Sequence, residues 1–267
     1  MGNNAYDEPG FFSSYRQLER STQGPESAME WPQLKSLFPV FFGKRVLDLG
    51  CGFGGLCRYV GREGAASVIG IDSSEKMLTE ARARTTEVNV DYRLGSMTDF
   101  EFPKASFDVV STLALHYVER IEPLFRRVAD VLAPGGSFVM SLEHPMFTAR
   151  AEQSWCELGG KRQHWPVDGY QEEGPRRTRF LGGDVLKHHR TVGTYVNSLI
   201  DAGFQIRRLI EPGPSAAQLA ERPEWADEAR RPMFVLIGAV KAPSPRPQAG
   251  TRSPRGRGDV RQGSPSS

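Results

Sequence analysis

Short hydrophobic runs alternate with amphipathic stretches along most of this chain. The runs predict buried β-strands at residues 46–49, 67–71, 88–93, 107–112 and 137–142. Between the runs, hydrophobic side chains recur every three or four residues and predict helices, most clearly in the series Ile121, Leu124, Phe125, Val128, Val131 and Leu132. Short strands that alternate with helices imply parallel pairing, so we expect an α/β protein with a doubly wound sheet.

The pattern changes after the fifth predicted strand. Residues 145–190 form a polar insertion that contains Trp155, Trp165, Tyr170 and Phe180, and a Gly182-Gly183 pair predicts a hairpin between Arg177 and Leu186. This insertion is either a lid over the reaction site or a flap that makes no substrate contact. A helix from Thr191 and two more strands, at 204–210 and 233–240, complete the core, which we assign to residues 44–241.

Both ends of the chain lie outside this core. Residues 1–43 contain Tyr6, Phe11, Phe12 and Tyr15, and Trp31, Leu34 and Leu37 follow at nearly helical spacing. We expect an N-terminal helical cap that either packs over the mouth of the site or covers only the sheet edge. Residues 242–267 are rich in Pro, Gly, Ser and Arg and lack aromatics, so we expect a disordered tail.

Charge and cysteine content narrow the functional classes. The net charge is +2, but the tail holds five arginines and one acid, which leaves residues 1–241 mildly acidic and argues against a nucleic-acid partner. Three cysteines without C-x-x-C spacing indicate neither disulfides nor a zinc site. The sequence shows no signal peptide and no membrane-spanning run, so a cytoplasmic location is expected.

The stretch VLDLGCGFGG at 46–55 predicts a strand that turns tightly into a helix around a ligand. Gly50, Gly52 and Gly55 satisfy G-x-G-x-x-G, and Asp72 follows at the distance of a ribose-binding acid, so a dinucleotide site is formally allowed. The carboxylate of Asp48, however, would repel a pyrophosphate and would suit a ligand with ammonium and sulfonium groups.

With these features the sequence resembles the class I S-adenosylmethionine-dependent methyltransferases. The segment at 95–110 resembles the family's adenine-binding turn and fourth strand, and the segment at 131–141 resembles the turn into its fifth strand. The resemblance implies a Rossmann-like, mostly parallel seven-stranded sheet with an antiparallel last strand. LALHYV, EHP and HRT are similar to segments of a bacterial small-molecule branch of the family.

The resemblance also implies where S-adenosylmethionine binds. Asp72 would bind the ribose hydroxyls, Met97 would lie on the adenine unless it is plain core, and Tyr15 is a candidate for the methionine carboxylate. Members often carry an acid at the position of Ser96, so the adenine contact would fall to Ser96 or Asp99, or be lost. The full expected set is Asp48, Gly50, Gly52, Gly54, Asp72, Ser73, Ser96, Met97 and Leu113.

Three of the histidines are expected to face one crevice: His116 and His144 end the fourth and fifth strands, and His189 begins the helix region that follows the insertion. Imidazole titrates near neutrality, so His116 at the end of the fourth strand is our candidate base, although a histidine there is often only scaffolding. The expected substrate-binding residues are His144, His189, Arg190 and Tyr195. No metal is expected, because the histidines lack metal-ligand spacing and neighbours 143 and 144 on a strand point to opposite faces.

The sequence thus predicts a methyltransferase that acts on an oxygen, nitrogen or carbon atom of a small molecule. The aromatic insertion favours a flat or apolar acceptor over a protein or nucleic acid. Two alternatives remain, an NAD(P)-dependent oxidoreductase and a non-catalytic S-adenosylmethionine-binding protein.

Overall fold

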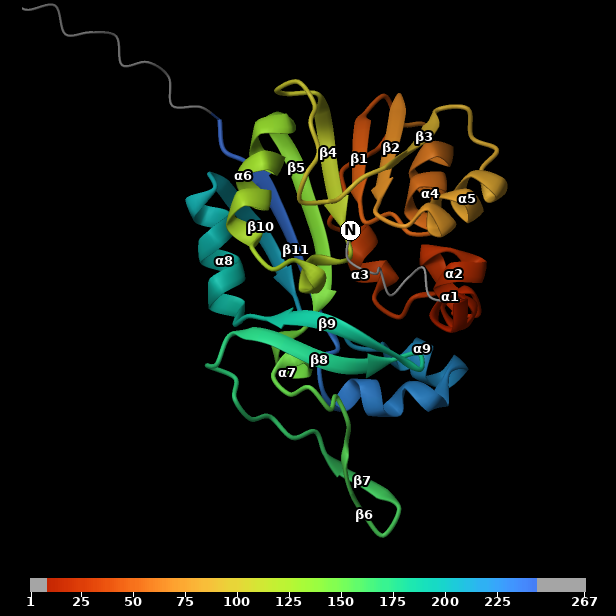
Figure 1. The fold of residues 1–267 in the computed structure, drawn as a ribbon, viewed down its shortest axis with the longest axis vertical. Coiled ribbons are helices and arrows are strands. Elements are labelled where there is room, and N and C mark those ends of the chain that lie inside the picture. The colour runs from red at the N-terminus through yellow and green to blue at the C-terminus, as the bar shows by residue number, and fades with distance from the viewer. Residues whose placement is uncertain (1–8, 244–267) are drawn as a thin grey trace, which may run out of the picture.

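A seven-stranded sheet forms the centre of the computed structural model, which describes residues 9–243 (Figure 1). Strand β1 (Arg45–Leu49) pairs in parallel with β2 (Ser67–Asp72) on one side and with β4 (Phe107–Thr112) on the other. Beyond them lie β3 (Val90–Leu94) and β5 (Leu132–Glu143), also parallel. The winding therefore reverses beside β1, where ligands of such sheets bind.

The other edge of the sheet contains the antiparallel strand. Strand β11 (Phe234–Lys241) lies between β5 and β10 (Phe204–Ile210) and runs antiparallel to both. The mostly parallel, Rossmann-like sheet with an antiparallel last strand is thereby confirmed.

Helices cover both faces because alternate strand residues point to opposite sides and both sides are apolar. Val46 and its neighbours on the same face pack against α3 (Trp31–Lys35), α4 (Gly55–Arg62) and α5 (Glu75–Arg84). The opposite face, which includes Leu47, packs against α6 (Ile121–Val131) and α8 (Val192–Asp201).

Several element boundaries differ from the prediction. Strand β3 begins at Val90, and Val88, predicted to start it, is fully exposed at 103%. Strand β5 begins at Leu132 and includes residues 134–136, which were predicted as a turn. Helix α5 is capped by Ser74, whose hydroxyl accepts from the N–H of Met77.

The N-terminal segment forms several short helical turns before the sheet. Helix α1 (Pro9–Arg16) is followed by α2 (Glu19–Gln23) and the 3₁₀ turn η2 (Pro25–Ser27). Both α1 and α2 lie near the end of the sheet where β1 and β2 finish (Figure 1). Tyr6 and nearly all of the predicted tail, residues 244–267, lie outside the described residues.

The insertion after β5 contains a hairpin that crosses the carboxyl end of the sheet (Figure 1). Its strands β8 (Gly174–Phe180) and β9 (Gly183–His189) pair antiparallel in the predicted place, over a longer span than predicted. A positive φ at Leu181 (50°) and at Gly182 (81°) closes the turn.

The remaining elements were not predicted from the sequence. A short helix α7 (Pro145–Thr148) precedes the projecting hairpin of β6 (Cys156–Leu158) and β7 (Lys161–His164). The 3₁₀ turn η3 follows β4, and α9 and the 3₁₀ helix η4 connect β10 to β11; their bounds are Leu115–Tyr117, Ala216–Glu221 and Pro223–Arg230. Within residues 9–243, none of the helices has the length and apolar composition needed to cross a bilayer.

The glycine turn yields a stability prediction. Gly54 has φ +70° and a Cβ there would lie 2.0 Å from the Tyr92 hydroxyl oxygen, whereas Gly135 has φ +75° and open space. Gly54→Ala should therefore lower the free energy of unfolding by about 2–5 kcal/mol, and the matched control Gly135→Ala by about 1–2 kcal/mol. Denaturant unfolding measures both, and equal losses would show that the contact with Tyr92 contributes nothing.

Candidate active site

The loop after β1 is tied to the end of β2. The N–H groups of Gly50 and Cys51 donate to the carbonyl of Ile71 at 2.8 and 3.0 Å. Gly50 has φ +76°, and a Cβ there would lie 2.7 Å from Cε of Met97. The loop is bare of side chains at this point because the neighbouring segment leaves no room for one.

Asp72 fixes the geometry of this loop from the end of β2. Its Oδ2 accepts from the N–H of Gly52 and its Oδ1 accepts from the N–H of Ser74, both at 2.9 Å. Each carboxylate oxygen has a second lone pair, so Asp72 can accept further hydrogen bonds from a ligand hydroxyl.

Asp48 supplies a second, more deeply buried carboxylate. It accepts from the Ser111 hydroxyl at 2.8 Å and from the Cys57 thiol at 3.5 Å, and it is 4% exposed. Burial raises its pKa to about 6, and within residues 9–243 it has no cationic side chain as an ion-pair partner. A cationic ligand would lower the cost of its charge.

The segment after β3 forms the adjoining wall. The Ser96 hydroxyl accepts from the N–H of Thr98 at 3.1 Å and bonds to its hydroxyl at 2.8 Å. Ser96, Met97 and Thr98 all line the cavity. Asp99 does not, and its side chain is 84% exposed, so of these two residues only Ser96 lies at the cavity.

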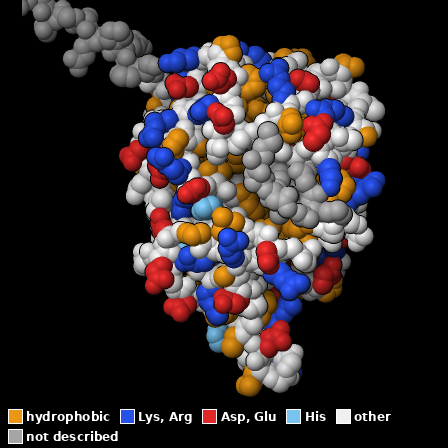
Figure 2. Space-filling view, in the orientation of Figure 1, with side chains coloured by type: hydrophobic (Ala, Val, Ile, Leu, Met, Phe, Trp, Pro, Cys, Tyr) orange, Lys and Arg blue, Asp and Glu red, His pale blue; other side chains and the backbone are white. Residues whose placement is uncertain are grey.

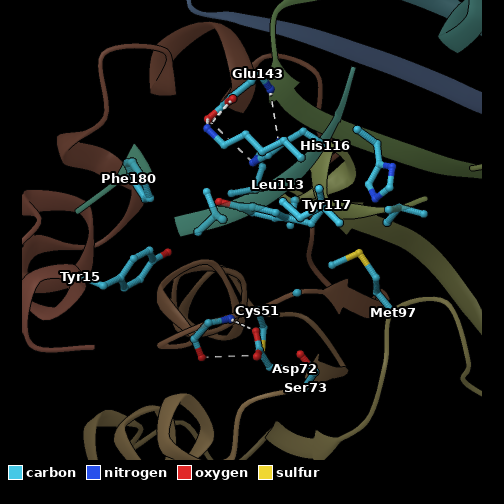
Figure 3. Close-up of a pocket in the computed structure, with 18 of the residues that line it drawn as sticks. Tyr15, Cys51, Asp72, Ser73, Met97, Leu113, His116, Tyr117, Glu143 and Phe180 are labelled. Carbon is cyan, nitrogen blue, oxygen red and sulfur yellow. Dashed lines mark hydrogen bonds and ion pairs between the residues drawn. The ribbon is translucent and has the colours of Figure 1, made fainter. Parts of the chain in front are cut away.

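A cavity of about 1100 Å³ extends from this loop to the β8–β9 hairpin (Figure 3). Asp72 and Ser73 lie on one side and Glu143 lies on the opposite side (Figure 3). The Tyr15 hydroxyl points into the space between them and lies 3.8 Å from the position of a Cβ on Gly52 (Figure 3). Burial raises the pKa of Tyr15, and the charge of Asp72 raises it further.

The far end of the cavity contains a buried polar cluster. Nζ of Lys187 donates to Oε1 and Oε2 of Glu143 at 2.6 and 2.8 Å and to Oε1 of Gln153 at 3.0 Å. Lys187 is 1% exposed, and Gln153 also donates to Glu143 at 3.2 Å. Although burial alone would raise the pKa of Glu143, His116 and Lys187 hold it below its usual value.

His116 lies beside this cluster. Its Nδ1 accepts weakly from the N–H of Glu143 at 3.5 Å, and its Nε2 lies 4.0 Å from Oε1 of the same residue. Burial lowers the pKa of His116 to about 4, so the ring is neutral at pH 7. The cavity thus joins a glycine loop with two carboxylates to a neutral imidazole beside a carboxylate.

The chain is similar to proteins that share this architecture. A family model described as a methyltransferase domain matches residues 46–136. A crystal structure of an S-adenosylmethionine-dependent methyltransferase from Mesorhizobium loti is 47% identical, covers 80% of this chain and 99% of its own, and superposes with a TM-score of 0.76. This chain belongs to the class I S-adenosylmethionine-dependent methyltransferases.

Two further relatives match most of this methyltransferase. A candidate S-adenosylmethionine-dependent methyltransferase from Listeria monocytogenes is 46% identical over 82% of this chain and 99% of its own, with a TM-score of 0.77. An uncharacterized protein from Haemophilus influenzae is 35% identical over 88% of this chain and 96% of its own. The family excludes the nicotinamide alternative and makes S-adenosylmethionine the cofactor. The buried, cation-free carboxylate of Asp48 at the cavity wall fits that choice.

All but one of the predicted cofactor-binding residues line the cavity, whereas none of the predicted substrate-binding residues does. Asp48, Gly50, Gly52, Asp72, Ser73, Ser96, Met97 and Leu113 line the cavity of the methyltransferase, as do His116 and Tyr15. Gly54 does not line it and instead packs against Tyr92.

His144 and His189 are bonded elsewhere. Nε2 of His144 bonds to Glu211 at 2.7 Å, and Nδ1 of His189 bonds to Thr148 at 2.9 Å. Burial lowers the pKa of both histidines. Neither lines the cavity, so the predicted crevice of three histidines is reduced to His116. His189 also ends β9, although it was predicted to begin the helix region.

Arg190 and Tyr195 also lie away from the cavity. The Arg190 guanidinium donates to the carbonyl groups of Val118 and Glu119, and Tyr195 is 2% exposed in the core. Arg190 thereby braces the end of β9 against the turn after β4, and Tyr195 is part of the core around α8.

Sequence reasoning missed Glu143 and Lys187 as site residues. Glu143 precedes His144 at the end of β5, and only one of two adjacent strand residues can face the cavity. Lys187 shares a strand face with the buried Val185 and His189, and a lysine on such a face was the available signal. In residues 9–243, no cluster of three or more His, Cys, Asp or Glu is placed to hold a metal ion.

Asp48 predicts a pH dependence of cofactor binding. Its raised pKa of about 6 means that Asp48 in the free protein becomes ionised as the pH rises through 6, and the sulfonium favours the ionised form. We expect S-adenosylmethionine to bind about tenfold more weakly at pH 5 than at pH 7, measured by calorimetry.

Two controls isolate this effect. Asp48→Asn should flatten the pH dependence, and S-adenosylhomocysteine, which lacks the sulfonium, should show a smaller one. The same slope in wild type and Asp48→Asn would assign the effect to another group. In the cofactor-free protein the sign is opposite, because a raised carboxyl pKa makes stability decrease as the pH rises from about 4 to 6.

Proposed function

We propose that this methyltransferase transfers the methyl group of its cofactor to an oxygen, nitrogen or carbon atom of a small molecule held beneath the β8–β9 hairpin. The continuous cavity carries this proposal. Its volume of about 1100 Å³ exceeds the roughly 300–1,000 Å³ of a pocket for one drug-sized ligand, so there is room for a second molecule. The aromatic rings of Tyr15, Phe147 and Phe180 line it, which favours a flat or apolar acceptor.

At the glycine end, each cofactor group is assigned to a lining residue. Asp72 accepts from the ribose hydroxyls, because its carboxylate lines the cavity beside the glycine loop. Ser96 and Met97 hold the adenine edge and face, and Tyr15 binds the methionine carboxylate. Ser73 and the backbone beside Leu113 complete the wall, and Gly54 acts only by shaping the loop.

At the far end, the protein positions the acceptor and excludes water. The bound cofactor supplies an electrophilic methyl group, so the chain's main contribution is alignment, worth up to roughly 7–11 kcal/mol of the barrier. The β8–β9 hairpin serves as the lid: Phe180 at its tip packs on Phe11 of α1 with ring centroids 5.9 Å apart. Together α1 and the hairpin separate the acceptor from bulk water.

His116 takes the proton when the acceptor has one to lose. The ring is unprotonated at pH 7, as a base must be. Its pKa of about 4 makes it a weak base, and the charge of Glu143, 4.0 Å from Nε2, increases its basicity. The 3.5 Å contact between Nδ1 and the N–H of Glu143 is at the long limit of a hydrogen bond, and it must open for Nδ1 to receive the proton. A small rotation of the ring is therefore part of this proposal.

The test of the function is transfer of a labelled methyl group from S-adenosylmethionine to the small molecules of a bacterial extract. Wild type should produce a labelled small molecule. Asp72→Asn should bind the cofactor about 1–3 kcal/mol more weakly, because an amide accepts less strongly than a carboxylate. The free energy of unfolding of the cofactor-free variant, compared with that of wild type, checks that the loop is intact. Absence of any labelled product despite tight cofactor binding would favour a non-catalytic binding protein.

Replacement of His116 tests proton transfer separately. With a protic acceptor, His116→Gln should lower kcat by about 100-fold and leave the Kd of the cofactor unchanged. His164→Gln, an exposed histidine on β7, is the matched control and should retain wild-type turnover. Wild-type kcat in His116→Gln would remove this residue from catalysis.

A further inference from the structure

The β8–β9 hairpin carries an excess of positive charge over the acceptor end of the cavity. Residues 174–190 contain five basic residues and one acid, Asp184, in a folded core that is slightly acidic as a whole. The basic residues are Arg176, Arg177, Arg179, Lys187 and Arg190.

Three of these cations have structural partners. Arg176 donates to the carbonyl groups of Ala149 and Glu172 at 2.9 and 2.6 Å. Lys187 pairs with Glu143, and Arg190 donates to carbonyl groups after β4. These contacts hold the insertion to the sheet, so none of the three is available to a ligand.

Arg177 and Arg179 are different. Among residues 9–243 neither makes a hydrogen bond or ion pair, both are exposed, and both line the cavity. Asp184 lies directly across from Arg179 on β9, yet the two do not form an ion pair. As residues i and i+2 of one strand they share a face, with Cα atoms about 7 Å apart. Figure 2 shows basic side chains over this hairpin beside a hydrophobic area.

The remaining charges at this end do not cancel the two arginines. Glu143 is neutralised by Lys187, and Arg120 lines the cavity together with Glu119 and Asp184. The net charge of the side chains at the acceptor end of the cavity is therefore positive. Guanidinium groups match the geometry of carboxylate and phosphate oxygens, and each can donate two parallel hydrogen bonds.

We propose that the methyl acceptor is an anionic small molecule whose carboxylate or phosphate group binds Arg177 and Arg179. Its nucleophilic atom then points toward the glycine loop, past Phe180 and His116. This inference rests on the proposed function, because it names the class of molecule that the same cavity methylates. The cofactor's own carboxylate is assigned to Tyr15, which lies between the glycine loop and Glu143, and the experiment distinguishes the two anions.

The first measurement identifies the charge of the product. Full-length enzyme is incubated with labelled S-adenosylmethionine and a small-molecule extract, and the labelled product is applied to an anion exchanger at pH 8. We expect the exchanger to retain the labelled product. Phosphatase treatment should abolish the retention if the anionic group is a phosphate and should not change it if the group is a carboxylate. A neutral or cationic product would overturn the inference while leaving the proposed function intact. No labelled product at all would overturn both.

The second measurement uses the purified acceptor. The double variant Arg177→Ala/Arg179→Ala should raise KM for the acceptor at least tenfold, with kcat within about twofold of wild type and the Kd of the cofactor unchanged. Arg207→Ala, an exposed arginine on β10, removes a positive charge elsewhere and should leave KM unchanged. An unchanged KM in the double variant, or a weakened Kd for the cofactor, would contradict the assignment.

Discussion

The ion pair between Lys187 and Glu143 connects the roof of the cavity to the sheet. Lys187 belongs to the hairpin and Glu143 ends the central strand β5, and both side chains are almost fully buried. Breaking a buried pair by removal of one partner typically costs about 3–5 kcal/mol, because the other charge is left without compensation. The hairpin therefore cannot detach cheaply, and the position of the acceptor end depends on this contact. Gln153 and His116 contact the same carboxylate, so the group that holds the hairpin to the sheet is also part of the candidate site.

The parts of the fold that could be predicted are those with local causes. Strand β4 was predicted with its observed bounds because it is a short apolar run between polar turns. The glycine turn and Asp72 were also identifiable from the sequence. Positive φ angles favour glycine, and an acidic residue directly after a short apolar run is visible in the sequence itself. The hairpin turn at Gly182 is a further case, since its conformation demands glycine locally.

The acceptor end could not be derived in the same way, because its geometry depends on contacts between distant residues. His144 looked equivalent to His116 by its position at a strand end, and His189 by its residue type beside the same edge of the predicted sheet. In the structure, His144 bonds to Glu211 and His189 bonds to Thr148, and neither partner can be identified from a local sequence pattern. Lys187 was overlooked for the same reason, since its partner lies 44 residues away.

The contact of Phe11 with Phe180 and with the hairpin turn has a consequence for biosynthesis. Helix α1 has eight residues, too few to be stable alone in water, and a Cβ on Gly183 would lie 3.0 Å from the Phe11 ring. One part of its docking surface, the hairpin turn, is translated about 170 residues later, which at ribosomal speed is a delay of roughly 8–35 s. The contacts of α1 with the hairpin can therefore form only late in synthesis, long after its contacts with Phe53 become possible.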